Sequence, residues 1–289
     1  MAIRPRRDEE AIGNLASFIV LLVAIGILLG VYYAYVVPVR PEAALVALPG
    51  DTVLAQYVGT FEDTGAVFDT SSLTVARDNA SYAKAFSFSW RARWEGLTFK
   101  IGDGTMIPGF DRGVIGMRED ETKTIRVPSA DGYGSADPSK LGARLLVETV
   151  PVRITMNLTE FAARYSGEPT SGAEVTDPIW GWPAIVTVAD TVATVTNSPE
   201  VGSRIRPYGG WDAIVLSIDD AADGGEGAIV VRHLLEPGHV DLVGGKEDGA
   251  DFYVSAVDSL DGTWTQNFNR QVVGRTLIFV VTLTSITRL

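Results

Sequence analysis

An apolar run without a single charged side chain lies close to the N-terminus, at residues 15–39. As a helix this run is about 37 Å long, and the hydrocarbon core of a bilayer is about 30 Å thick, so the run is long enough to span a membrane. Arginines precede it at positions 4, 6 and 7, and only Arg40 follows it closely. The length of the run predicts a single-pass anchor at residues 14–39, in contact with lipid through residues 15–39, and the positive-inside rule gives its orientation. This rule places residues 1–13 in the cytoplasm and the functional domains outside it.

A cleaved secretory signal is the alternative for this segment. The apolar stretch is longer than the core of a normal signal peptide, and no A-x-A-like cleavage site follows it before Pro38. We therefore expect the segment to be retained as an anchor.

Composition excludes several classes of function. The net charge of -12 and the absence of a dense Lys and Arg run argue against nucleic acid as a partner. Cysteine is absent, which removes disulfides and thiol nucleophiles, and there is no G-x-S-x-G motif of a hydrolase. His233 and His239 lie near acidic residues, where a metal site is one interpretation. In a strand-to-loop passage we expect them to be solvated loop residues, and we predict no metal and no cofactor.

Strand and helix patterns follow one another after the apolar run. VLAQYVGTF and AVFDTSS flank a turn at residues 62–65 and predict a hairpin. IPGFDRGVIGM has apolar residues at helical spacing behind Pro108, and its glycines mean that the helix needs a sheet to pack on. Further strands are predicted in LTFKIGDG, in ETKTIRVPSADGYG and in the C-terminal TLIFVVTLTSI. The pattern predicts one sheet interrupted by a long insert, with residues 73–96 as a flap.

The interrupting segment, residues 135–268, is predicted to be rich in β-strands. It contains one short helix, LTEFAARYSG, with Thr159 placed to cap it and Gly167 to end it. GWPAIVTVAD at 181–190 matches GWDAIVLSID at 210–219, and FYVSAVDSLDGTWT at 252–265 repeats the pattern. Each unit predicts a hairpin that turns at or just after an aspartate. Duplication is one interpretation, and the shared composition of hairpins is the other.

Taken in order, these segments resemble the FKBP family. The matching features are Tyr57 with Gly59, the F-D-T-S corner at 68–71, G-x-x-x-x-I-x-G-F…G-x-x-G-M at 102–117, Tyr133 with Gly134, and T-L-x-F at 276–279. The resemblance implies an α+β fold in which a twisted antiparallel half-barrel sheet wraps a short helix. It also implies that residues 48–134 and 269–289 form one discontinuous domain, and that this domain catalyses peptidyl-prolyl cis/trans isomerisation.

The same resemblance implies a pocket for a proline ring. The catalytic positions of the family correspond to Tyr57, Phe68, Asp69, Phe110 and Tyr133. The positions that line the pocket correspond to Leu97, Phe99, Met106, Ile107 and Phe279. Phe110 stands where better-known members have a tryptophan, which makes the stacking surface smaller. Each of these residues taken alone is typical of core packing or of a turn.

The insert narrows the resemblance to SlyD-type FKBPs. Those proteins interrupt the catalytic domain after the Tyr-Gly turn and return through N-x-x-x-x-G-x-x-L-x-F, which Asn269, Gly274, Leu277 and Phe279 match. The insert is larger than the family's usual one and the histidine-rich tail is missing, so no metal role is carried over. The resemblance implies a chaperone domain at 135–268 that binds unfolded or partly folded proline-containing proteins.

Trp182 and Trp211 are candidates for binding such clients, and packing in a small β core is their alternative. The predicted function is a membrane-anchored isomerase with holdase activity. A catalytically weak or inactive FKBP-fold binding module or chaperone, tethered to the membrane, is the alternative.

Overall fold

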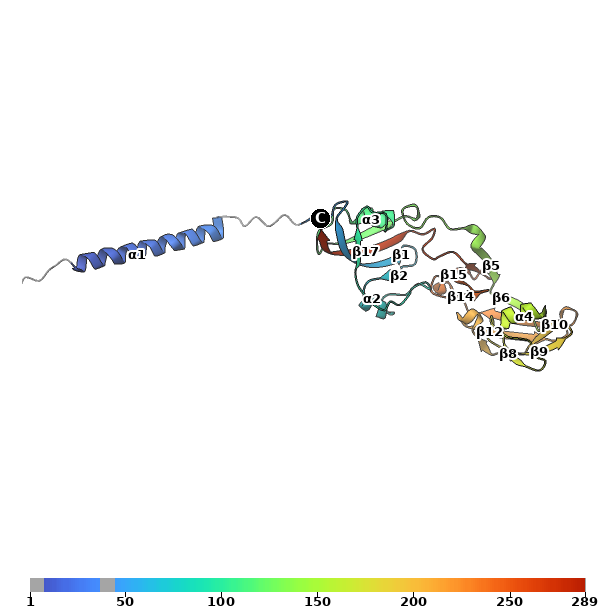
Figure 1. Cartoon of the computed structure of the whole chain (residues 1–289). Coiled ribbons are helices and arrows are strands. Elements are labelled where there is room, and N and C mark those ends of the chain that lie inside the picture. Colours follow the sequence, from blue (N-terminus) through green and yellow to red (C-terminus); the bar gives the residue numbers. More distant parts are fainter. Residues whose placement is uncertain (1–7, 37–44, 289) are drawn as a thin grey trace, which may run out of the picture. The chain divides into compact units, whose positions relative to one another are not determined.

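The structure, a computed structural model, describes residues 8–36 and 45–288 (Figure 1). It divides into two compact units, Met1–Leu45 and Val46–Leu289. The first unit contains helix α1 (Asp8–Val31) and the π-helical turn η1 (Tyr32–Val36). The arginines at positions 4, 6, 7 and 40, and the end of the predicted span at 37–39, lie outside the described residues.

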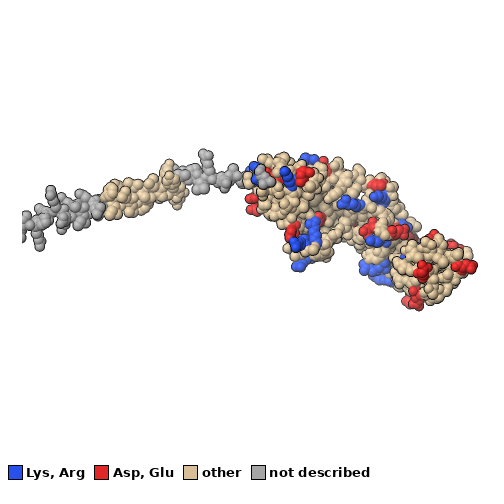
Figure 2. All heavy atoms as spheres, viewed as in Figure 1, with Lys and Arg blue, Asp and Glu red and all other residues tan. Residues whose placement is uncertain are grey.

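One helix in the described part of the chain is long and apolar enough to cross a membrane. Its window Phe18–Tyr35 has a mean hydropathy of 2.4, and none of it is buried. In Figure 2 its described side chains show no Lys, Arg, Asp or Glu, whereas the surface of the second unit mixes both signs. Such a helix fits a membrane anchor or a signal sequence.

The second unit begins with an antiparallel sheet of five strands, called here the first sheet. Its path is β2-β1-β17-β4. β3 pairs with the first four residues of β1, Thr52–Ala55, and β2 pairs with residues near the end of β1. The strands are β1 (Thr52–Phe61), β2 (Val67–Thr70), β3 (Leu97–Lys100), β4 (Thr122–Val127) and β17 (Leu277–Thr287). β1 and β17 pair along their whole length, from Thr52 opposite Thr287 to Phe61 opposite Leu277 (Figure 1). Two segments at opposite ends of the unit's sequence therefore lie side by side.

Helix α3 (Pro108–Val114) packs on the first sheet through Phe110 and Val114, which are 3% and 0% exposed. Its glycines permit this close approach. A Cβ at Gly113 would lie 2.4 Å from a methyl of Ile125, and one at Gly109 would lie 2.6 Å from a methyl of Val127. Glycine weakens a helix, and here it brings the helix backbone down onto the sheet.

Between β4 and β17 the chain forms three four-stranded antiparallel sheets. It enters through three consecutive strands that each supply an edge to a different sheet: β5 (Leu141–Leu145), β6 (Val147–Pro151) and β7 (Arg153–Asn157). The remaining strands return in reverse order as three sets of three. They are β8 (Glu174–Thr176), β9 (Pro183–Ala189), β10 (Val192–Asn197), β11 (Arg204–Ile205), β12 (Ala213–Asp219), β13 (Ala228–His233), β14 (Gly244–Glu247), β15 (Ala250–Asp258) and β16 (Thr263–Asn267).

We name the sheets by their place along the insert. The distal module is β7-β10-β9-β8, the middle module is β6-β13-β12-β11, and the proximal module is β5-β16-β15-β14. The same backbone hydrogen bond closes each module where its last strand meets the entering segment. These bonds run from Asn197 N to Val152 O at 2.7 Å, from His233 N to Leu146 O at 2.8 Å, and from Phe268 N to Lys140 O at 2.9 Å. The three modules are therefore nested inside one another.

The hairpins of the modules turn where the sequence repeat predicted. The β9–β10 turn contains Asp190 with φ 52°, and the other two turns follow Asp219 and Asp258. The third copy is as complete as the first two, and this explains the large size of the insert. Three small hydrophobic cores lie in the insert, and two of them take tryptophans from the neighbouring module. Trp180 and Trp182, which precede β9, pack in the core of the middle module, and Trp211, which precedes β12, packs in the core of the proximal module.

The helix of the distal module, α4 (Leu158–Tyr165), differs from the prediction at both ends. Asn157 caps it instead of Thr159, because Asn157 and Glu160 exchange side-chain-to-backbone hydrogen bonds of 2.9 and 3.1 Å. At the other end Ser166, with φ 55°, takes the left-handed conformation expected of Gly167. The remaining short helices are α2 (Leu73–Arg77) in the flap and the 3₁₀ turns Ser129–Asp131, Pro138–Lys140, Pro207–Gly209, Asp223–Gly225 and Pro237–His239.

Trp182 and Trp211 lie inside the modules and not on their surface. They are 2% and 4% exposed, and their indole N–H groups donate to Asn197 and His233, each at 2.9 Å. These positions correct the expectation that both rings bind clients, since a buried tryptophan with a satisfied N–H has no face open to a partner. His233 is likewise buried and not a solvated loop residue, and its Nε2 lies 2.6 Å from Glu148 Oε1.

Candidate functional site

Four aromatic rings converge on the side of the first sheet that faces α3. Tyr57 comes from β1, Phe68 from β2, Phe110 from α3 and Phe279 from β17. The centroid distances are 5.0 Å for Phe110–Phe279, 5.6 Å for Phe68–Phe279, 6.2 Å for Tyr57–Phe110 and 6.4 Å for Tyr57–Phe279. We call this group the aromatic pocket. It joins residues from both sides of the insert.

The other predicted lining residues lie against the same group. Phe99 is 5.7 Å from Phe110, and Leu97, Met106 and Ile107 are half-buried against the same core. Gly59 follows Tyr57 on β1, and a Cβ there would lie 2.7 Å from Phe68 Cζ and 3.0 Å from Phe279 Cε1. Glycine is therefore required at this position for the rings to meet.

Asp69 holds the hydroxyl of Tyr57 at the edge of the pocket. The Tyr57 hydroxyl donates to Asp69 Oδ2 at 2.7 Å, and Arg91 Nη2 donates to the Tyr57 oxygen at 2.8 Å. Arg91 also forms an ion pair with Asp69. Burial, and then the bond to Asp69, raise the pKa of Tyr57, so the phenol stays a neutral donor at any physiological pH.

Arg91 belongs to the flap and was not expected from the sequence. Nothing local marks it, because the flap also carries Arg77 and Arg93. The flap itself contains an aromatic cluster in which Trp90 and Trp94 are 5.6 Å apart and Phe88 lies 6.3 and 6.4 Å from them. Arg93 also stands next to a tryptophan, so only the structure distinguishes Arg91 from the other arginines of the flap.

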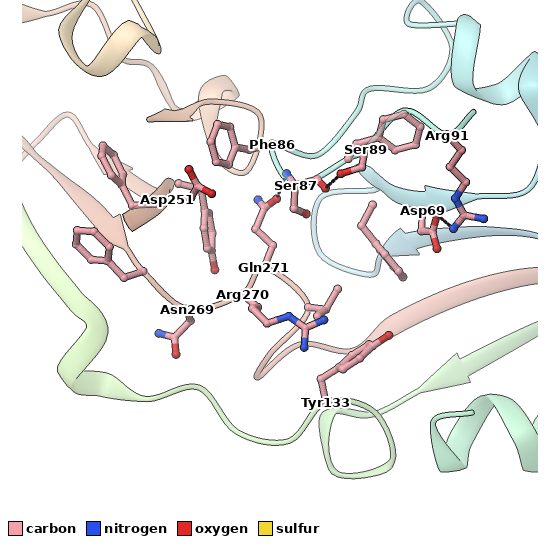
Figure 3. A pocket seen from close by; sticks show the side chains of 16 residues that line it. Asp69, Phe86, Ser87, Ser89, Arg91, Tyr133, Asp251, Asn269, Arg270 and Gln271 are labelled. Atoms are coloured by element: carbon pink, nitrogen blue, oxygen red, sulfur yellow. Dashed lines mark hydrogen bonds and ion pairs between the residues drawn. The ribbon is translucent and has the colours of Figure 1, made fainter. Parts of the chain in front are cut away.

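A cavity of about 650 Å³ opens beside the aromatic pocket, and we call it the junction cleft (Figure 3). It is lined by the first sheet and its following turn, by the flap, by the proximal module and by the segment that returns from the insert. The lining residues are Phe68, Asp69, Phe86, Ser87, Phe88, Ser89, Arg91, Tyr133, Asp251, Phe252, Tyr253, Phe268, Asn269, Arg270, Gln271 and Val272. Tyr133, the last predicted catalytic residue, is 38% exposed here and does not join the four packed rings.

Buried polar contacts fix the walls of the junction cleft. Asp241, which precedes β14, accepts from Arg275 Nη1 at 2.7 Å, and Arg275 also pairs with Asp63 in the β1–β2 turn. The Arg275 guanidinium lies 3.9 Å from the centroid of the Phe61 ring. In the flap, Phe86 N donates to Asp241 O at 2.8 Å. Burial raises the pKa of Asp241, and its bond to Arg275 opposes that rise. The proximal module, the flap and the first sheet are thus held together at one point.

In the described residues, no group of three His, Cys, Asp or Glu side chains is arranged to hold a metal ion. The site offers a cluster of packed apolar rings with the Tyr57 hydroxyl at its edge, and the exposed Tyr133 lies in the neighbouring junction cleft. This arrangement suits a reaction that depends on shape and on an apolar surface.

Comparison with known proteins agrees with this geometry. The family profile described as FKBP-type peptidyl-prolyl cis-trans isomerase matches residues 46–146. The short-type peptidyl-prolyl cis-trans isomerase of Methanocaldococcus jannaschii is 31% identical over 156 residues, which cover 54% of this chain and 85% of that protein. FK506-binding protein 2 of Aspergillus oryzae is 33% identical over 115 residues, 39% of this chain and 72% of that protein. Peptidyl-prolyl cis-trans isomerase FPR2 of Saccharomyces cerevisiae is 31% identical over 98 residues, 34% of this chain and 58% of that protein.

The chain belongs to the family of FKBP-type peptidyl-prolyl cis-trans isomerases. It is an isomerase that acts on proline-containing substrates. We refer below to β1–β4, α3 and β17 as the FKBP part.

Proposed function

We propose that the aromatic pocket is the isomerase site and that the prolyl ring of a client enters between Phe68, Phe110 and Phe279. The convergence of rings from both sides of the insert carries this proposal. Leu97 and Phe99 support the pocket from β3, and Met106 and Ile107 support it from the residues before α3. Tyr57, Asp69 and Tyr133 form its polar edge.

The proposed reaction needs no covalent step. Rotation about an X-Pro bond meets a barrier of about 18–20 kcal/mol, because the twisted amide loses its conjugation. The twisted state has a less polar carbonyl than the planar one, so an apolar pocket without water favours it. Tyr133 donates its hydroxyl to the turning carbonyl, a contribution of about 1–3 kcal/mol at most. Asp69 and Arg91 position the Tyr57 hydroxyl.

The three modules are proposed to act as a SlyD-like chaperone domain that captures unfolded clients for the pocket. Exposed apolar side chains along the entering strands support this role. Leu141, Leu145 and Val147 are 46%, 56% and 43% exposed and alternate with half-buried positions along β5 and β6. A surface of this kind binds other apolar segments. Trp182 and Trp211 contribute only indirectly, because they pack inside the cores of the middle and proximal modules.

We further propose that α1 remains as a membrane anchor with its N-terminus in the cytoplasm. The clients are then extracytoplasmic proteins that fold near the membrane. The apolar helix without buried residues supports the anchor, and the arginines before it support the orientation.

The test uses residues 46–289, which form a compact unit of their own. This unit is expected to accelerate cis/trans exchange of an Ala-Pro peptide, measured by NMR exchange spectroscopy. Phe68→Ala and Tyr133→Ala are each expected to lower the rate about five-fold. Tyr82→Ala is the matched control, because Tyr82 is 40% exposed and lies outside the junction cleft. A folded unit with no acceleration would favour the binding module over the isomerase.

A further inference from the structure

The segment that returns from the insert carries an exposed arginine between two buried amides. Asn269 and Gln271 are 7% and 3% exposed. Asn269 Nδ2 donates to Asp137 O at 3.0 Å, and Gln271 Nε2 donates to Asp241 O at 3.0 Å. Both neighbours of Arg270 are thus held in place, and its side chain projects into the junction cleft (Figure 3).

The guanidinium of Arg270 lies over the ring of Tyr133, with 5.3 Å between its Cζ and the ring centroid. Figure 3 shows the two side chains pointing toward each other across the cleft. Stacking uses one face of the guanidinium and leaves the N–H donors on its edge available. These donors therefore lie beside a residue of the proposed polar edge.

The other charged groups that line the junction cleft have partners. Asp69 is paired with Arg91, and Asp251 Oδ1 lies 3.4 Å from Lys246 Nζ. Within residues 8–36 and 45–288 no ion pair involves Arg270, so it is the one lining cation without a carboxylate partner. An arginine edge binds a carboxylate with two parallel hydrogen bonds, and this geometry is more selective than that of a lysine.

We propose that Arg270 determines specificity by binding an acidic side chain of the client close to the reacting proline. The inference rests on the isomerase site proposed above. An extended peptide advances about 3.3 Å per residue, and Arg270 touches a residue at the edge of the pocket. Only the one or two residues on either side of the proline come within reach of it.

The test uses the full chain in detergent micelles and labelled peptides that contain one proline. In separate peptides, Glu replaces Gln at one of four positions: the two residues before the proline and the two residues after it. At one of these positions Glu is expected to increase binding, measured by fluorescence anisotropy, and kcat/KM about three- to five-fold. The gain is expected to vanish in about 1 M salt, where the screening length is about 3 Å.

Variants assign the gain to Arg270. Arg270→Gln is expected to bring the ratio of Glu-peptide to Gln-peptide binding to one, and Arg270→Glu to make a Lys peptide the preferred one. Arg270→Lys keeps the charge without the fork and is expected to retain part of the gain. Arg232→Gln removes an exposed arginine of the middle module and is expected to leave the ratio unchanged.

Three results overturn the proposal: equal binding of all peptides, an acidic preference that survives Arg270→Gln in a folded variant, or no peptide binding by the folded wild-type chain. An Arg270-dependent preference in binding without any catalysis would support the inference and contradict the proposed isomerase site. Equal catalysis of the Glu and Gln peptides would support the proposed isomerase site and contradict the inference about Arg270.

Discussion

In the FKBP part, β17 pairs with β1 and β4 across the whole insert, and all its strands share one hydrophobic core. In the insert, three short sheets repeat one design around three small cores, and tryptophans of one module complete the core of the next. The ends of the insert lie next to each other, since Lys140 O accepts from Phe268 N at 2.9 Å and Gly134 O accepts from Gly274 N at 2.7 Å. An insert whose ends meet leaves the pairing of the first sheet intact. The FKBP part thus depends on one core completed by β17, whereas the insert repeats a hairpin design whose neighbouring units share tryptophans.

The largest effect is expected from a cavity in the shared core. Leu277 is 0% exposed on β17, and Leu277→Ala is expected to lower the free energy of unfolding by about 3 kcal/mol and to impair catalysis at 37 °C. Val195 is 0% exposed in the distal module, and Val195→Ala is expected to cost about 2 kcal/mol locally. Peptide isomerisation should then stay normal while hydrogen exchange rises in the distal module alone. If Val195→Ala impairs catalysis as much as Leu277→Ala, the two regions form one cooperative unit.

A smaller effect is expected from removing one module. The distal module spans residues 153–197, and its excision leaves Val152 and Ser198 close enough to join, because Asn197 N donates to Val152 O. The excision also removes Trp180 and Trp182 from the core of the middle module, which is expected to loosen. Joining Val152 to Ser198 through a Gly-Asn turn is expected to leave peptide isomerisation within about twofold.

Catalysed refolding of a proline-limited protein is expected to fall by about tenfold, because the exposed apolar side chains Ile185 and Val192 of the distal module are lost. A matched excision of 147–233 leaves only the proximal module, without the Trp211 that packs in its core, and should lower catalysed refolding further. Refolding activity that is independent of the number of modules would contradict the capture role.

The smallest effect concerns the pH dependence of the FKBP part. Arg288 donates to both carboxylate oxygens of Asp51, at 2.8 and 2.6 Å, and joins the end of β17 to the start of β1. This bond, helped by the N–H of Leu48, lowers the pKa of Asp51 from 3.8 to about 2. A folded-state pKa below the unfolded one stabilises the fold above pH 3.8, and the contribution is lost as the pH falls toward 2.

The stability difference between wild type and Asp51→Asn, measured in urea, is therefore expected to be constant above pH 5 and to shrink below pH 4. Other carboxylates titrate in both proteins and cancel. Asp248→Asn in the proximal module is the control, because Asp248 forms no ion pair among the described residues. A difference for Asp51→Asn that does not change with pH would show that the pair with Arg288 contributes nothing.

Much of the FKBP part was predictable because its signals are local. Alternation in 52–61 marks β1, Pro108 marks the start of α3, and the F-D-T-S corner marks the end of β2. The repeat with its turn aspartates likewise predicted the hairpins of the insert. Such features depend on neighbouring residues, whose spacing the sequence displays directly.

The partner of each strand and the neighbours of each side chain were decided by tertiary structure. The sequence did not reveal that β5, β6 and β7 divide among three sheets, nor that Trp182 and Trp211 turn inward. It also did not reveal that Arg91 reaches Asp69 from the flap, or that Arg270 stacks on Tyr133. These contacts join residues far apart in the chain, and their energy depends on how the backbone segments are placed relative to one another in the folded unit. By itself, the sequence determined the periodicity, the turns and the apolar helix, because these depend on neighbouring residues alone.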